Sequence, residues 1–207
     1  MLKSHRLAAL AAVLVIGAVT PANAVQVTYS TSGTFGSSGT ALLDQGGAQI
    51  RFNPQTLTSV DVPPTTNAIF GSFTTVQAPA NPGVMLVDTF TLRITQTAPA
   101  PGGELVFTST VGGRIFLNNS QAFIQFDTPL AKSIDSGGFL TTYRIVEGDA
   151  ANPGRLELFG GLDQTSTLNG EIGLVAVPEP GTMALACVAL PLLGLGYMRR
   201  RRRQAAS

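Results

Sequence analysis

The chain contains few of the side chains on which enzymes depend for nucleophilic and redox chemistry. Its 207 residues include no tryptophan, a single histidine, His5, and a single cysteine, Cys187. These two residues lie near opposite ends, so the long segment between them contains neither type. This excludes Ser-His-Asp and Cys-His catalysis there, together with the usual protein ligands of zinc, copper and haem. The sequence therefore predicts no catalytic residue of these classes, no cofactor, and a core without disulfide bonds.

Carboxylates are the catalytic side chains that remain. A glycosidase needs two of them on either side of a cleft, about 5–9 Å apart. Glu104, Glu157 and Glu171 lie in or beside predicted strands, so one reading is that two of them meet on one sheet face. The alternative is that all three are ordinary charges on the outer faces of strands. We expect the second arrangement.

Acidic residues also occur in predicted turns, where a calcium site is the functional alternative. Glu147-Gly148-Asp149 places two acids on one turn, and Asp135 precedes a Ser-Gly-Gly turn. The regularly spaced aspartates of a calcium-binding loop are missing. Ordinary turn acids are therefore expected, and a calcium site stays open as the alternative.

The N-terminus has the pattern of a secretory signal peptide. Two basic residues precede an apolar stretch from Leu7 to Val19, which is short for a membrane span. Small residues follow at Ala22 and Ala24, the −3 and −1 positions of a cleavage site. We expect export through the Sec translocon and cleavage by signal peptidase, so that the mature chain starts at Val25; an uncleaved anchor is the alternative.

The C-terminal tail combines three elements in a fixed order. Pro178, Glu179 and Pro180 form a stiff, extended segment, because each proline fixes its own φ and restricts the residue before it. The uncharged segment from Gly181 to Met198 follows. As a helix it would span roughly 27 Å, close to the hydrocarbon core of a bilayer. The tail then carries five basic residues that would act as a stop-transfer signal and hold the end in the cytoplasm, namely Arg199, Arg200, Arg201, Arg202 and Arg203.

This order of elements resembles the PEP-CTERM sorting signal of Gram-negative bacteria that make exopolysaccharide. The resemblance is confined to the tail. It implies that an exosortase-like enzyme recognises Pro178, Glu179 and Pro180 while the apolar helix holds the precursor in the inner membrane. It also implies a final location at the cell surface or in the extracellular matrix, with exopolysaccharide as a candidate partner.

The segment between the two ends is predicted to be one exported domain. It contains six of the thirteen basic residues and eleven of the twelve acidic residues, which gives it a net charge of −5. An acidic surface argues against nucleic acid as a partner, since binding would need a basic stripe. The complete division is 1–24 signal peptide, 25–177 exported domain, 178–180 sorting motif, 181–198 transmembrane helix and 199–207 basic tail.

The exported domain is predicted to be all-β. Short stretches alternate apolar and polar residues, which is the pattern of half-buried strands. The predicted strands lie at 25–30, 49–52, 56–60, 68–76, 90–95, 104–110, 114–117, 124–127, 139–146, 156–158 and 171–177. Gly-Gly and Asn-Pro pairs separate them, and the string Ala-Asn-Pro-Gly occurs twice, at 80–83 and 151–154. Pro-Gly suits the two central positions of a type II turn. We expect an antiparallel β-sandwich or jelly roll.

Aromatic residues give no clear sign of a sugar-binding platform. Tyr29 and Tyr143 fall on apolar strand faces and are therefore expected in the core. Asn118-Asn119-Ser120 matches a glycosylation sequon, a pattern that also arises by chance. We expect a non-enzymatic surface or matrix protein. The alternative is a secreted glycan-binding or glycan-hydrolysing module, which an exposed aromatic or a paired-carboxylate cleft would favour.

Overall fold

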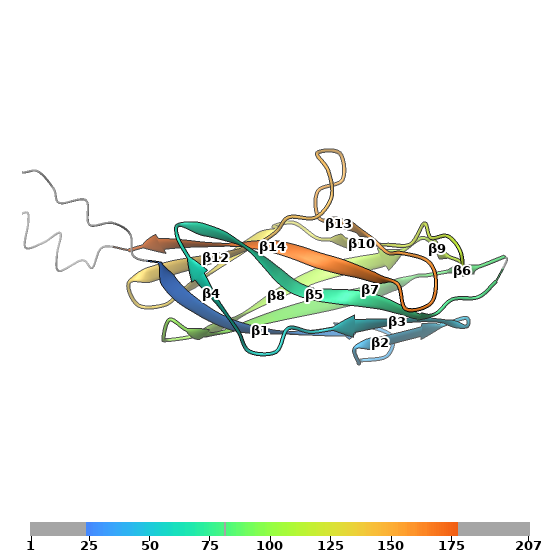
Figure 1. Cartoon of the computed structure of the whole chain (residues 1–207), viewed down its shortest axis with the longest axis horizontal. Helices are drawn as coiled ribbons and strands as arrows, with labels where there is room; N and C mark the ends of the chain where they lie inside the picture. The colour runs from blue at the N-terminus through green and yellow to red at the C-terminus, as the bar shows by residue number, and fades with distance from the viewer. Residues whose placement is uncertain (1–23, 81, 178–207) are drawn as a thin grey trace, which may run out of the picture.

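Two large antiparallel sheets and one two-stranded sheet make up the described part of the chain (Figure 1). The computed structural model describes residues 24–80 and 82–177, and this part of the chain forms strands without helices. The strands are β1 (Val25–Phe35), β2 (Leu42–Gln45), β3 (Ala48–Asn53), β4 (Thr58–Val62), β5 (Thr65–Gln77), β6 (Val84–Met85), β7 (Asp88–Ala98), β8 (Gly103–Gly112), β9 (Arg114–Ile115), β10 (Phe123–Phe126), β11 (Ala131–Asp135), β12 (Phe139–Ile145), β13 (Arg155–Glu157) and β14 (Thr165–Ala176). The predicted all-β class is confirmed.

Each large sheet has six strands. The first sheet has the order β13-β10-β8-β7-β1-β4, and the second has the order β11-β12-β14-β5-β3-β2. The short strands β6 and β9 pair separately. Every strand pairing in the described part of the chain is antiparallel, as the sequence predicted.

The core lies between the facing sheets and is rich in aromatic rings. Phe90 on β7 of the first sheet lies 4.9 Å, centroid to centroid, from Phe73 on β5 of the second. The Tyr29 ring on β1 lies 6.0 Å from the Tyr143 ring on β12 in the same way. Both tyrosines are fully buried, which confirms their predicted place in the core. This face-to-face packing is that of a β-sandwich.

Most strands lie where the alternation predicted them, but three were missed. These are β2, β6 and β11. β6 has only two residues and β11 turns a single large apolar residue, Ile134, into the core. A period-2 pattern cannot be read from so few inward positions. β14 also starts earlier than predicted, at Thr165, because its first residues are polar even on the buried face, as Ser166 shows.

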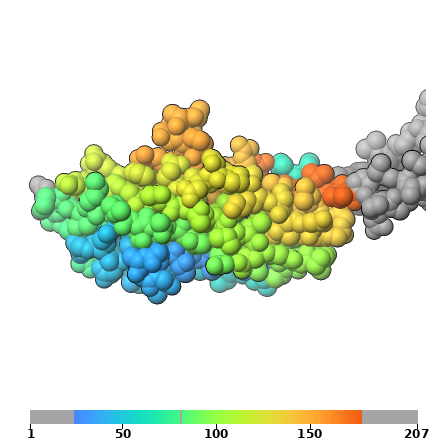
Figure 2. All heavy atoms as spheres, turned by 180° about the vertical axis from the view of Figure 1, so that it is seen from behind, coloured from blue at the N-terminus to red at the C-terminus, as the bar shows by residue number. Residues whose placement is uncertain are grey.

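The two ends of the described chain leave the sandwich at the same end. Val25 pairs with Val62 at the end of β4, and the N–H of Leu174 donates to the carbonyl of Pro64 at 2.9 Å. Figure 1 shows the start of β1 beside the end of β14 here, and Figure 2 shows the end of β14, in red-orange, at one end of the long axis. The predicted sorting tail and the predicted signal peptide up to Asn23 lie outside the described residues. Within 24–80 and 82–177, no helix is long and apolar enough to cross a membrane.

Candidate functional site

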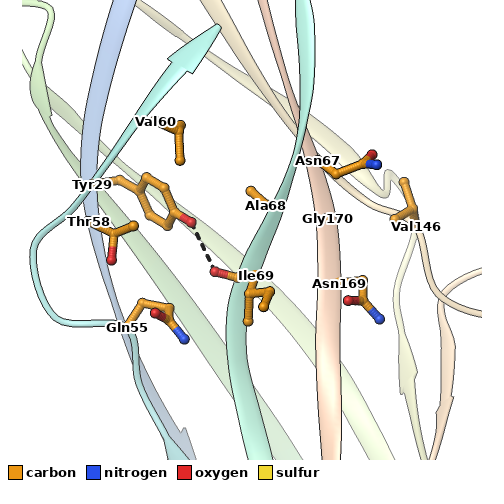
Figure 3. A pocket seen from close by; sticks show the side chains of 10 residues that line it. All are labelled: Tyr29, Gln55, Thr58, Val60, Asn67, Ala68, Ile69, Val146, Asn169 and Gly170. Carbon is orange, nitrogen blue, oxygen red and sulfur yellow. Dashed lines mark hydrogen bonds between the residues drawn. The ribbon is translucent and has the colours of Figure 1, made fainter.

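An open groove of about 590 Å³ lies on the side of the sandwich (Figure 3). It forms because two strand edges have no partner there. β4 is the outer strand of the first sheet, and β3 pairs with β5 only as far as Asn53 and Ser72. The start of β5 therefore has no neighbour on that side. The groove lining is Tyr29, Gln55, Thr58, Val60, Asn67, Ala68, Ile69, Val146, Asn169 and Gly170.

Tyr29 forms the floor of this groove. Its hydroxyl donates to the backbone carbonyl of Ile69 at 2.9 Å, a bond that joins the two sheets across the opening. Burial raises the pKa of Tyr29 to about 12. The pKa of Tyr143 behind it is also raised, first by burial and then by the neighbouring Tyr29. Both phenols are therefore neutral near pH 7 and serve structure rather than proton transfer.

The groove walls are uncharged and combine amide and hydroxyl groups with apolar side chains. Amide side chains come from Gln55 on one side and from Asn67 and Asn169 on the other (Figure 3). Gln55 is fixed through its backbone, because its N–H donates to the Thr31 hydroxyl at 2.8 Å. Such a surface offers hydrogen bonds to a neutral ligand, and its described lining includes no charged side chain. Sequence reasoning missed it because it depends on where β3 leaves β5, a tertiary feature.

The three candidate glycosidase carboxylates lie far apart. Glu157 is opposite Phe123 and therefore level with Gly112, at one end of β8, whereas Glu104 is at the other end of that strand. Eight residues at about 3.4 Å each separate these two levels of the sheet by roughly 27 Å. Glu171 belongs to β14 in the second sheet. Glu104 pairs with Arg93, and Glu157 pairs with Arg155.

The turn acids considered for calcium bond to their own loops. Asp149 accepts hydrogen bonds from the N–H groups of Ala151 and Asn152, which lower its pKa. Glu147 accepts from the N–H of Asn169, although burial raises its pKa overall. Asp135 accepts from the N–H of Gly137 at 3.2 Å. Among the described residues, no three His, Cys, Asp or Glu side chains gather in a group suited to a metal ion.

The residues predicted to act in sorting are not among those described. Pro178, Glu179, Pro180 and the arginine block all follow Val177, the last described residue, and Ala22 precedes the first. The structure does describe Asn118-Asn119-Ser120, which forms part of an exposed turn after β9.

Comparison with known proteins finds one region of similarity. No curated protein and no solved structure matches the chain. Residues 176–203 match the family model of the PEP-CTERM protein-sorting motif, which confirms the resemblance seen in the sequence. A signal of this kind indicates export, a membrane-anchored precursor and processing by an exosortase-like route. The chain therefore carries a PEP-CTERM sorting signal in its C-terminal tail.

Proposed function

We propose that this protein is a non-enzymatic exported protein of the cell surface or extracellular matrix. Signal peptidase removes residues 1–24, the apolar helix at 181–198 holds the precursor in the inner membrane, and an exosortase-like enzyme reads Pro178, Glu179 and Pro180. The observation that carries the proposal is the match of residues 176–203 to the sorting motif.

The geometry of the sandwich supports this proposal. Both ends of the exported domain leave at one end, so a tail in the membrane would hold that end nearest the bilayer. The remaining strands would then extend away from the membrane. The wide separation of Glu104 and Glu157, together with the uncharged groove, supports a role in binding or structure rather than in hydrolysis.

A second candidate is a glycan-binding module that uses the same sorting route. The observation that favours it is an exposed aromatic ring, Phe159, in the loop that precedes the start of β14. This candidate is compatible with the sorting proposal, since it concerns what the exported domain does after it arrives.

The sorting proposal is tested by replacing Pro178, Glu179 and Pro180 with alanine in the native host. We expect an unprocessed form of higher mass that stays in the membrane fraction, because the enzyme loses the stiff segment that it recognises. Immunoblotting of fractionated cells and mass spectrometry measure this. The matched control is Val175→Ala, which changes an exposed side chain three residues before the motif and should be processed normally. Unchanged mass and location of the triple variant would refute the proposal.

A further inference from the structure

Phe159 stands out from the other aromatic side chains that the structure describes. Nine of them are buried in the core, and Phe159 alone is exposed, at 59%. Its backbone is nevertheless held firmly. Its N–H donates to the Ser166 hydroxyl at 3.0 Å, and its carbonyl accepts from the Thr75 hydroxyl at 2.8 Å. Since Ser166 and Thr75 are both buried, the ring is presented to solvent by an anchored backbone.

A cleft of about 330 Å³ lies beside this ring. Its opposite wall is the turn after β9, with Asn118, Asn119 and Ser120. Gly160 allows the two loops to meet, because a Cβ on this residue would lie 2.4 Å from the carbonyl oxygen of Asn119. The turn itself is closed by a bond of 2.9 Å from the N–H of Phe116 to the same oxygen. Both walls of the cleft are thus fixed by backbone contacts.

The hollow continues around the turn. A second depression of about 360 Å³ is lined by Ala80 and Phe116 and shares Asn118 and Asn119 with the first. Each depression is at the lower end of the range for small-molecule sites. Together they would accommodate more than one ring of a chain-like ligand, with the two asparagines between the rings.

The side chains of Asn118 and Asn119 have donors and acceptors that no described residue uses. Among the described residues, the Asn118 side-chain amide has no hydrogen-bond partner, and Asn119 uses only its oxygen, which accepts from the N–H of Ser120 at 2.7 Å. A carboxamide offers a donor and an acceptor side by side, which suits two adjacent hydroxyl groups. The unused amides therefore point to a ligand rich in hydroxyl groups.

The lining of the cleft favours an uncharged ligand over an anionic one. The charged lining residue is Glu157, whose side chain is 58% exposed and pairs with Arg155 at 2.5 Å. The Arg155 guanidinium in turn stacks on the Phe123 ring at 3.8 Å, and it does not line either depression. The Glu157 carboxylate is thus balanced by Arg155, and no cationic side chain of the described residues lines the cleft to receive a carboxylate on the ligand.

We propose that this cleft binds an uncharged pyranose unit of a glycan, with the sugar stacked on Phe159 and its hydroxyls bonded to Asn118 and Asn119. The face of an aromatic ring carries a partial negative charge and attracts the polarised C–H groups of a pyranose ring. The amides satisfy the hydroxyls at the edge of the same ring.

The cleft lies at the end of the sandwich opposite the tail. The loop that carries Phe159 leads into Thr165, the start of β14, whereas the chain leaves toward the tail at Ala176, the end of this strand. Eleven steps of about 3.4 Å give roughly 37 Å between these points. The cleft thus faces away from the membrane if the tail is anchored there, as the proposed sorting requires. Sugar binding itself does not depend on it.

The test uses the full chain, purified in a polyoxyethylene detergent that contains no sugar. Calorimetric titration with cellotetraose, mannotetraose and maltotetraose, and with tetragalacturonate as an anionic probe, measures binding. We expect saturable binding of at least one neutral oligosaccharide and none of tetragalacturonate. Failure of all three neutral probes, or binding of the anionic probe alone, would overturn the proposal. Neither result would affect sorting, which is measured separately in the host.

Variants localise the binding. Phe159→Ala should weaken it about tenfold, a change of about 1.4 kcal/mol, while Phe159→Tyr keeps the ring and should stay within about twofold. Asn118→Ala should also weaken binding, and its exposed position leaves folding unaffected. Leu57→Ala, a change at an apolar side chain that is 69% exposed and outside the cleft, is the control. Equal affinities of Phe159→Ala, Asn118→Ala and the control would contradict the assignment to this cleft.

Discussion

Gly170 and Gly173 are three residues apart on β14 but meet different surroundings. A Cβ on Gly170 would lie 2.0 Å from the Phe70 ring, which is fully buried between the sheets. A Cβ on Gly173 would meet its nearest atom, in the Thr65 side chain, at 3.6 Å, an ordinary contact. Core packing therefore requires glycine at position 170, whereas position 173 has room for a Cβ.

Gly170→Ala should lower the free energy of unfolding by about 1–3 kcal/mol, the usual cost of forcing extra volume into a packed core. The Phe70 ring cannot move freely, because the Tyr29 and Tyr143 rings lie within 6.1 Å of it, centroid to centroid. Urea denaturation measures the effect. Gly173→Ala is the control and should be near neutral; equal losses in the two variants would show that β14 itself, rather than Phe70, resists alanine.

The sequence predicted some residue positions well and others not at all. Tyr29 and Tyr143 were placed in the core because each alternates with polar neighbours on its strand, and both are there. The exposure of Phe159 was not predictable from alternation. It depends on hydrogen bonds to Thr75 and Ser166, of which the first is distant in sequence. Local patterns report the face of a strand, and they do not report how a loop is anchored.

At the scale of elements, both Ala-Asn-Pro-Gly strings form turns, but only the second places Pro-Gly at the central positions as predicted. At 152–155 the N–H of Arg155 bonds to the carbonyl of Asn152, so Pro153 and Gly154 occupy the central positions. At 80–83 the N–H of Gly83 bonds to the carbonyl of Ala80, one residue earlier in the string. The first turn must close before Val84, where β6 begins and pairs with β9. The pairing of the strand that follows a turn cannot be predicted from the four residues of the turn.

Gly154→Ala tests how tightly the second turn is built. Gly154 has a φ of +79°, and a Cβ there would lie 2.6 Å from the side chain of Leu130. Its carbonyl also accepts from the N–H of Phe126 on β10, so the turn is tied to the first sheet. Left-handed backbone alone costs a non-glycine residue about 1–2 kcal/mol, and the contact should add to this. The midpoint of thermal unfolding measures the loss.

Gly39→Ala is the matched control for this turn. Its φ is +64°, yet nothing lies within 4 Å of a Cβ at this position. It should therefore show the backbone cost of about 1–2 kcal/mol without the steric one. A Gly154 variant no less stable than the Gly39 variant would mean that Leu130 moves aside freely.

At the scale of the whole molecule, the tail and the body were predictable to different degrees. The sorting signal is a contiguous segment, so its order of elements is readable directly from residues 176–203. The sandwich was predictable as a class, since period-2 strands and frequent turns leave few alternatives. The order of strands within each sheet was not, and neither was the groove beside Tyr29, because both depend on pairings between strands far apart in sequence.

The stability of the whole sandwich should fall in alkaline solution. Tyr29 on the first sheet and Tyr143 on the second meet in the core, and burial raises both pKa values, that of Tyr29 from 10.0 to about 12. The folded state therefore holds these protons more tightly than the unfolded chain does. Their contribution is complete below pH 10 and is lost as the pH rises from 10 toward about 12, where the unfolded phenols ionise first.

Urea denaturation across this range, combined with the ultraviolet absorbance of the phenolate, measures the loss. Tyr29→Phe removes one of the two groups, so its free energy of unfolding should fall less steeply above pH 10 than that of the native chain. The lost bond to the Ile69 carbonyl lowers stability by a similar amount at every pH below 10, because Tyr29 is protonated there in both the folded and the unfolded chain. If the free energy of unfolding falls equally steeply with pH in the two proteins above pH 10, Tyr29 is not a source of the alkaline loss of stability.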